Sequence, residues 1–135
     1  MVGNRPLMTW WTTWIQKSFN LGANVFYEMN WPCRPGNEGD NQRVYRMPVN
    51  CAISGCVIGI DSDAETGTFR VRVYTGTYQT LVLDQTTESS SAEASIRMYF
   101  TTPYNVSENT NISLQVSQTT TGREFTVQLF GYQYV

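Results

Sequence analysis

The stretch Phe69-Arg70-Val71-Arg72-Val73 decides the fold class of this 135-residue chain. Its three apolar side chains alternate with two arginines, and successive side chains of a β-strand point to opposite faces of the sheet. One face of the segment is therefore apolar and the other is charged, as in a strand with one buried and one solvated face. The stretch predicts an antiparallel strand at the surface of a hydrophobic core.

The same two-residue period recurs along most of the chain. In residues 125–134 the apolar phase switches beside Gly131, which predicts a bulge or bend. About eight segments are expected to be strands: residues 25–31, 44–47, 51–60, 69–73, 78–83, 96–100, 112–116 and 125–134. Gly, Pro, Asn and Asp separate these segments, and the regular spacing predicts an all-β fold, an antiparallel two-sheet β-sandwich.

Residues 1–20 are expected to form a short N-terminal aromatic arm, and residues 21–135 a single β-sandwich domain. The spacing of Trp10, Trp11 and Trp14 in the arm would allow one short helix. Three tryptophans make a dense apolar patch that is costly to expose. The patch is expected to serve assembly by docking on a neighbouring subunit, and folding back over its own sheet is the open alternative.

The charge of the chain limits the kinds of partner that we expect it to bind. Charged residues make up 15% of the sequence, the net charge is −2, and no run of Lys or Arg occurs. Soluble domains average roughly 25% charged residues, so the surface is expected to be neutral and polar, which suits contacts between subunits. Without a basic run nothing would neutralise a phosphate backbone, and we expect no nucleic-acid partner. Residues 1–20 hold neither a signal-peptide core nor a membrane span.

The sequence contains no histidine, which excludes catalytic triads and metal schemes that depend on one. The acidic residues fall mostly in turn-rich segments, so we predict a protein that is not an enzyme and needs no cofactor. Asp61, Asp63 and Glu65 alternate in a loop and are weak candidates for a calcium-type site, since hard cations favour clustered carboxylates. They lack the glycine and terminal glutamate of an EF-hand, and an ordinary acidic turn is the preferred interpretation.

Three cysteines, Cys33, Cys51 and Cys56, are an odd number without CxxC spacing. They are expected to be small buried apolar residues in a reducing compartment. One disulfide, for example between Cys33 and Cys51, stays open as an alternative.

The chain has four Trp, eight Tyr and six Phe, and flat rings with a polar edge suit the faces of sugars. Most rings that alternate with polar residues are expected in the core. Tyr74, Tyr78, Tyr99 and Tyr104 fall at strand ends or on the opposite face, and they are the weak candidates for ligand binding.

Two stretches resemble the small jelly-roll domains of phage and other virus structural proteins. The resemblance covers about residues 43–135. The first stretch leads into the early core strands, and the second runs through a Thr-Gly turn into a closing hairpin: Tyr45-Arg46-Met47-Pro48-Val49-Asn50-Cys51-Ala52-Ile53-Ser54-Gly55, and Ile112-Ser113-Leu114-Gln115-Val116-Ser117-Gln118 followed by Phe125-Thr126-Val127-Gln128-Leu129-Phe130-Gly131.

This resemblance implies a jelly-roll sandwich and a non-enzymatic virion structural protein: a capsid, decoration, vertex or fibre-tip subunit. It implies self-association, with a homotrimer favoured, contacts with other virion proteins, and localisation in the virion after synthesis in the host cytoplasm. The chain lacks the shaft and coiled coil of fibre proteins, which favours a capsid or vertex subunit. The alternative function is a carbohydrate- or receptor-binding module that takes a surface glycan.

Overall fold

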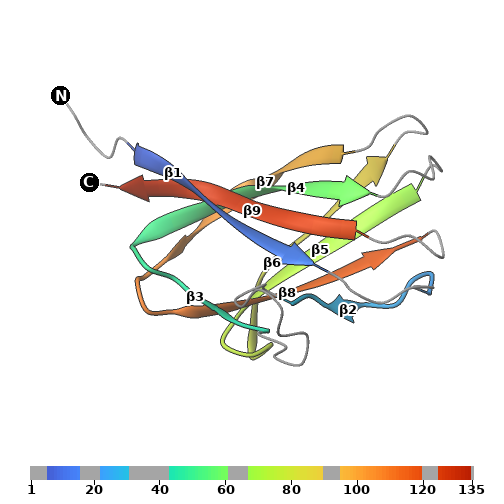
Figure 1. The fold of residues 1–135 in the computed structure, drawn as a ribbon, viewed down its shortest axis with the longest axis horizontal. Helices are drawn as coiled ribbons and strands as arrows, with labels where there is room; N and C mark the ends of the chain where they lie inside the picture. Colours follow the sequence, from blue (N-terminus) through green and yellow to red (C-terminus); the bar gives the residue numbers. More distant parts are fainter. Residues whose placement is uncertain are drawn as a thin grey trace, which may run out of the picture.

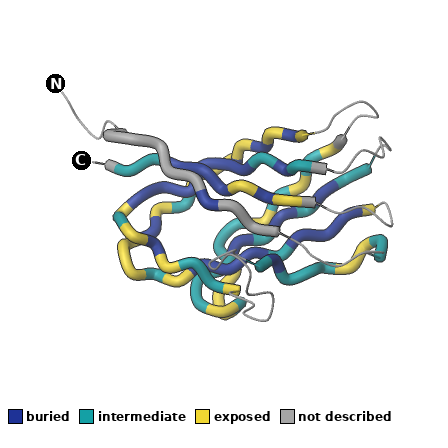
Figure 2. The backbone as a smooth tube through the Cα atoms, viewed as in Figure 1, coloured by how far each residue is buried: buried dark blue, intermediate teal, exposed yellow. Residues whose placement is uncertain are grey.

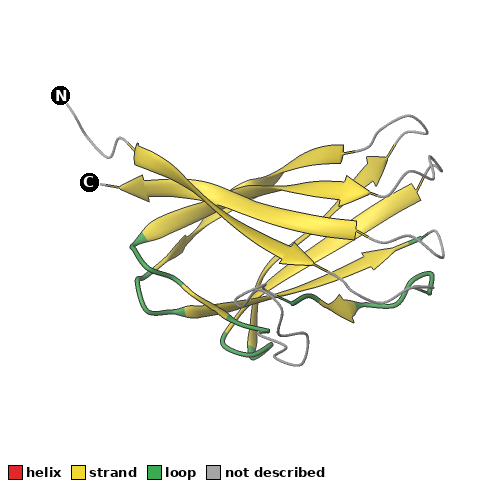
Figure 3. Ribbon diagram, in the orientation of Figure 1, coloured by secondary structure: helices red, strands yellow, loops and turns green. Residues whose placement is uncertain are grey.

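Two antiparallel β-sheets form two layers in the structure, a computed structural model that describes residues 6–15, 22–30, 43–60, 67–89, 95–119 and 125–134 (Figure 1). No helix occurs in these residues (Figure 3). The strands of this described part are β1 (Pro6–Ile15), β2 (Tyr27–Glu28), β3 (Tyr45–Arg46), β4 (Cys51–Ile60), β5 (Gly67–Thr75), β6 (Thr80–Ser89), β7 (Ser95–Val106), β8 (Asn111–Gln118) and β9 (Phe125–Tyr134). The predicted all-β, two-sheet sandwich is confirmed.

The strands pair in a nested order. β1 pairs with β9, β2 and β3 with β8, β4 with β7, and β5 with β6, so that the chain resembles one long hairpin rolled over on itself. Further pairing of β4 with β9 and of β5 with β8 joins these hairpins into sheets of order β1-β9-β4-β7 and β2-β8-β5-β6, with β3 also on β8. β7 and β6 are edge strands of the two sheets, and they contact each other along one flank of the sandwich.

The core lies between the sheets, where the alternation in the sequence predicted it. Phe69, Val71 and Val73 of β5 are buried, whereas Arg70 and Arg72 between them are partly exposed. Figure 2 shows the buried positions running through both layers, with exposed backbone gathered mainly toward their ends. Buried apolar side chains of the first sheet, such as Ile53, Ile58, Met98, Val127 and Leu129, form one cluster with those of the second sheet, such as Ile112, Leu114 and Val116. Each fully buried side chain of this size contributes roughly 1.5–3 kcal/mol.

A bulge in β4 lies opposite the point where the apolar phase of the last strand switches. The switch itself reflects Phe130, which packs on Tyr99 and is not part of the core cluster. Ile53 pairs with Gly131 and Gly55 with Phe130, so Ser54 is an extra residue opposite two consecutive residues of β9. The bulge predicted beside Gly131 is therefore found there, but its extra residue belongs to β4. A side chain at Gly55 would place Cβ 2.5 Å from both the carbonyl oxygen of Met98 and the Cζ atom of Phe130. Only glycine permits this close approach.

Strand β1 lies in the segment expected to be the N-terminal arm. Residues 6–15, for which a short helix was allowed and folding back over the sheet was the open alternative, form a strand that pairs with β9 from Pro6↔Tyr134 to Ile15↔Thr126. Thr12 of this strand is 5% exposed and lies opposite the fully buried Leu129. Threonine and tryptophan favour strands, and pairing with β9 completes the sheet. Over these residues the segment is thus a strand of the sandwich.

Two other predicted strands have shifted limits. The segment predicted over residues 25–31 is reduced to the two residues of β2; Val25 is 48% exposed, although Met29 is buried. The strand predicted from Tyr78 begins at Thr80, because Gly76 and Tyr78 adopt φ values of 70° and 56° in the turn between β5 and β6. Left-handed backbone of this kind ends a strand.

Candidate functional site

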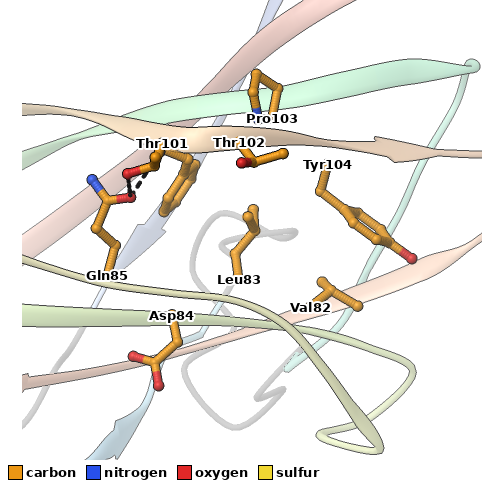
Figure 4. A pocket seen from close by; sticks show the side chains of 9 residues that line it. Val82, Leu83, Asp84, Gln85, Thr101, Thr102, Pro103 and Tyr104 are labelled. Carbon is orange, nitrogen blue, oxygen red and sulfur yellow. Dashed lines mark hydrogen bonds between the residues drawn. The ribbon is translucent and has the colours of Figure 1, made fainter.

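A pocket opens on the flank where the edge strands β6 and β7 meet (Figure 4). It has a volume of about 360 Å³ and is lined by residues 82–85 of β6 and residues 100–104 of β7. That volume lies at the lower end of the range for small-molecule sites. No other lining segment contributes among the described residues, so the pocket is formed by two strands that are adjacent in the chain.

Two facing irregularities create this pocket. In β7, Tyr99 pairs with Gly55 and Tyr104 with Ile53, so four residues of β7 stand opposite one residue of β4. In β6, Leu83 pairs with Val73 and Leu81 with Tyr74, which leaves Val82 as an extra residue. Bulges re-aim side chains and are frequent at sheet edges and beside functional sites. Here they hold the two edge strands apart and leave a hollow between them.

The side chain of Gln85 fixes one end of the pocket. Its Nε2 donates a hydrogen bond to the carbonyl oxygen of Tyr99 at 2.6 Å, and its Oε1 accepts one from the backbone N–H of Thr101 at 2.9 Å. The Thr101 hydroxyl lies 3.3 Å from the same Oε1 (Figure 4). The carboxamide thus bonds the outer edge of β7 as the backbone of a neighbouring strand would. We call this contact the Gln85 clamp; it joins the two sheets at the flank.

The charge at the pocket is neutralised on its far side. Asp84 points away from β7 in Figure 4, and it accepts two hydrogen bonds of 2.7 Å from Arg70 and one of 3.3 Å from Arg72. The hydrogen bond from Arg70 lowers the pKa of the Asp84 carboxyl, and the charges of both arginines act in the same direction. The Arg72 guanidinium also stacks 4.0 Å from the ring centre of Phe26. The described lining of the pocket therefore carries no free charge.

The structure places Tyr74, on β5, and Tyr78, in the turn between β5 and β6, outside the pocket lining. Their rings meet edge to face, with 5.6 Å between centroids. The Tyr74 hydroxyl donates to Oε1 of Gln115 at 2.9 Å, and the Tyr78 N–H donates to the Ser113 hydroxyl at 2.9 Å. Burial raises the pKa of the Tyr78 phenol. These contacts tie the β5–β6 turn to β8, which is a structural role.

The other two predicted tyrosines lie on β7. Tyr99 is 57% exposed, and its ring contacts that of Phe130 edge to face at 5.6 Å, on the face of the sheet turned away from the core. Tyr104 is half-buried, packs against the core and lines the pocket. Of the four candidates, Tyr104 alone is placed in the pocket, and the four do not form one site.

The structure says less about the residues predicted for assembly and for metal binding. Trp10, Trp11 and Trp14 lie on β1, where they pair with Gly131, Phe130 and Val127 of β9; their side chains lie outside what the structure describes. The weak metal candidates Asp61, Asp63 and Glu65 also fall outside the described residues. Within the described ranges, no group of three Cys, Asp or Glu side chains could hold a metal ion. No helix in those ranges is long and apolar enough to cross a membrane.

Two of the cysteines are buried free thiols. Cys51 is 3% exposed and Cys56 is fully buried, and neither forms a disulfide. Burial raises the pKa of Cys51 to about 11 and that of Cys56 to about 12, so both thiols are poor nucleophiles near neutral pH. Cys33 lies outside the described residues.

Sequence reasoning missed the pocket residues Val82, Gln85 and Thr102. One signal for them was present: Pro103 follows Phe100 closely, and a proline within a strand pattern indicates an edge strand or a bulge. Gln85 gave no signal, because a polar residue on a strand looks the same whether it faces water or bonds another strand.

Comparison with known proteins adds no assignment: no family model matches the chain, and no curated protein matches it.

Proposed function

We propose that this chain is a non-enzymatic structural protein of a virion, a capsid, decoration, vertex or fibre-tip subunit that acts through protein–protein assembly. The nested pairing of the strands supports a jelly-roll topology, an eight-stranded arrangement that viral capsid and lectin domains use. In this view β2 and β3 together stand for one interrupted strand beside β8.

The observation that carries the proposal is the open edge at β1. From Met8 to Ile15 this strand keeps an unbroken register with β9, and β9 is its only neighbour among the described strands. Residues 7–15 contain no charged residue and no proline. Proteins usually blunt a free edge with charge, proline or bulges. In β1, Pro6 and a register irregularity lie at the start of the strand, and the regular, uncharged stretch from Met8 to Ile15 is therefore suited to contact with another subunit.

The opposite flank supports the same interpretation by contrast. There β6 and β7 carry bulges, β7 contains Pro103, and the Gln85 clamp occupies part of the β7 edge. These are the features that protect an edge from pairing with another chain. Among the described strands, the β6–β7 flank carries features that hinder strand addition and the β1 edge carries none from Met8 to Ile15, which favours β1 as the assembly contact.

A lysine placed on each edge tests the proposal. Thr13→Lys puts a charge on β1, opposite the exposed Gln128, and should lower the mass of the assembly measured by light scattering. Thr102→Lys puts the same charge on the exposed bulge of β7 and should leave that mass unchanged. Equal effects of the two substitutions would remove β1 from the assembly contact.

A carbohydrate- or receptor-binding module is the second proposed function. Lectin domains also use the jelly roll, and the flank pocket is the specific observation that favours this function, because it leaves a hollow on an edge that is otherwise closed to strands.

A further inference from the structure

We propose that the pocket between β6 and β7 binds one or two units of a neutral saccharide, with Tyr104 as the ring on which the sugar packs. This inference rests on the second proposed function, the binding module, and is independent of assembly through β1. The proposed site is one pocket and includes only one of the four tyrosines that the sequence suggested for ligand binding.

The walls of the pocket are fixed before any ligand binds. The Gln85 clamp holds the β7 bulge at Tyr99 and Thr101, and Phe100 beside it is buried in the core at 4% exposure. Leu83 and Tyr104 both pack against the core cluster. A site held by packed side chains and hydrogen bonds loses little freedom on binding, which favours a small ligand of modest contact area.

The lining has the chemistry that a sugar needs. The ring of Tyr104 on β7 and the side chain of Val82 on β6 both line the pocket and offer apolar surface (Figure 4). The Thr102 and Tyr104 hydroxyls make no hydrogen bond to any described residue, so both can bond to a ligand. Flat aromatic surface beside hydroxyl groups suits the apolar face and polar rim of a pyranose ring.

Charge argues for a neutral ligand. No Lys or Arg is among the described lining residues, so none of them would neutralise a phosphate or carboxylate. Asp84, the one acidic residue among the described lining residues, is already bonded by Arg70 and Arg72 and points away from β7 (Figure 4). An ionic ligand would be buried without a partner, which is unfavourable.

The irregular edges argue against a peptide as the ligand. A peptide that adds to a sheet edge needs a continuous row of backbone donors and acceptors. Pro103 has no N–H, the clamp already occupies Tyr99 and Thr101, and Val82 breaks the ladder of β6. A compact ligand that bonds through hydroxyl groups fits where an extended strand does not.

The test is a titration of the ¹⁵N-labelled full chain with methyl glycosides of neutral hexoses and N-acetylhexosamines and with their disaccharides, followed by amide chemical shifts. We expect at least one of them to shift the amides of residues 82–85, Thr101, Thr102 and Tyr104. The Thr102→Arg substitution, at an exposed position, should fill the pocket without unfolding the chain and weaken binding at least about tenfold. Tyr104→Ala should do the same, and its thermal midpoint separates lost binding from lost structure.

Arg97→Ala is the control, since Arg97 is an exposed side chain of the same strand outside the pocket lining; its binding should equal that of the unsubstituted chain. Three results would overturn the inference: no shift with any saccharide of the panel, shifts confined to other parts of the sheets, or binding that survives Thr102→Arg. None of these results depends on the mass of the assembly, so a failed assembly proposal and a failed saccharide proposal remain distinguishable.

Discussion

The Gln85 clamp predicts that a change of one functional group will destabilise the flank in a pH-dependent way. In Gln85→Glu the carboxylate can still accept a hydrogen bond from Thr101 N–H, but it cannot donate to the carbonyl oxygen of Tyr99, 2.6 Å away in the native clamp. The substitution removes one hydrogen bond and places the new carboxylate oxygen next to the carbonyl oxygen of Tyr99, so that two acceptors repel each other. Together these effects should lower the free energy of unfolding by about 1–2 kcal/mol at neutral pH.

Acid should restore much of this loss. When the introduced carboxyl is protonated, it can again donate to the Tyr99 carbonyl, so the folded state favours the protonated form. The pKa of this carboxyl is then raised above its unfolded value of about 4.3. For a carboxyl with a raised pKa, stability is lost as the pH rises through that pKa and regained as it falls. The deficit relative to the unsubstituted chain should therefore be smaller at about pH 4 than at about pH 7.

Urea unfolding of the two chains at both pH values, followed by circular dichroism, measures the effect. The control is Gln79→Glu, which makes the same chemical change at an exposed residue of the β5–β6 turn and should cost little at either pH. The reasoning is refuted if Gln85→Glu is as stable as the unsubstituted chain at neutral pH, or if its deficit is the same at both pH values.

Three further predictions concern the core and the charged face. Gly55→Ala should lower the free energy of unfolding by about 1–3 kcal/mol because its Cβ would meet the Met98 carbonyl oxygen and the Phe130 ring. Gly59→Ala should lower it less, because its Cβ would meet only the hydroxyl of the Thr126 side chain. Urea unfolding of both variants measures the difference, and equal losses of stability would contradict the account. The lowered pKa of Asp84 stabilises the fold above its unfolded pKa of about 3.9, and this stabilisation is lost as the pH falls through the folded value. Asp84→Asn should thus be less stable at neutral pH, with a difference that shrinks in acid; a constant difference in acid titrations would count against the ion pairs. The Cys56 peptide should be alkylated at about pH 8 at least about a hundredfold more slowly in the folded than in the unfolded chain, as mass spectrometry would show, and similar rates would mean that the thiol is accessible.

The strands that the sequence predicted best are those whose environment is set by their own side chains. Val71 and Val73 alternate with Arg70 and Arg72, and this local pattern states which face is buried wherever the partner strand lies. The limits of β4 and β9 were also predicted correctly, because turn residues flank both apolar segments. Two sheets that each have one apolar face bury these faces by packing against each other, and the structure shows this sandwich.

The features that the sequence did not predict depend on contacts between distant residues. Residues 6–15 join the sheet because β9, more than a hundred positions away, offers a partner in register, and nothing in the tryptophan spacing encodes that partner. The pocket depends on which residues the bulges of β6 and β7 leave unpaired, and a bulge changes hydrogen bonding without changing the hydrophobic pattern. The sequence places Tyr74 and Tyr78 at strand ends or on the face opposite the core, but it does not show that Gln115 and Ser113 of β8 hydrogen-bond to them.

The measurement that tests the central claim most directly is the mass of the purified chain in solution, by light scattering over a concentration series. The proposed subunit should give a discrete closed oligomer, with a trimer of three 15.4 kDa chains favoured, that dissociates only on dilution. A mass of 15.4 kDa at every concentration would contradict assembly through the β1 edge.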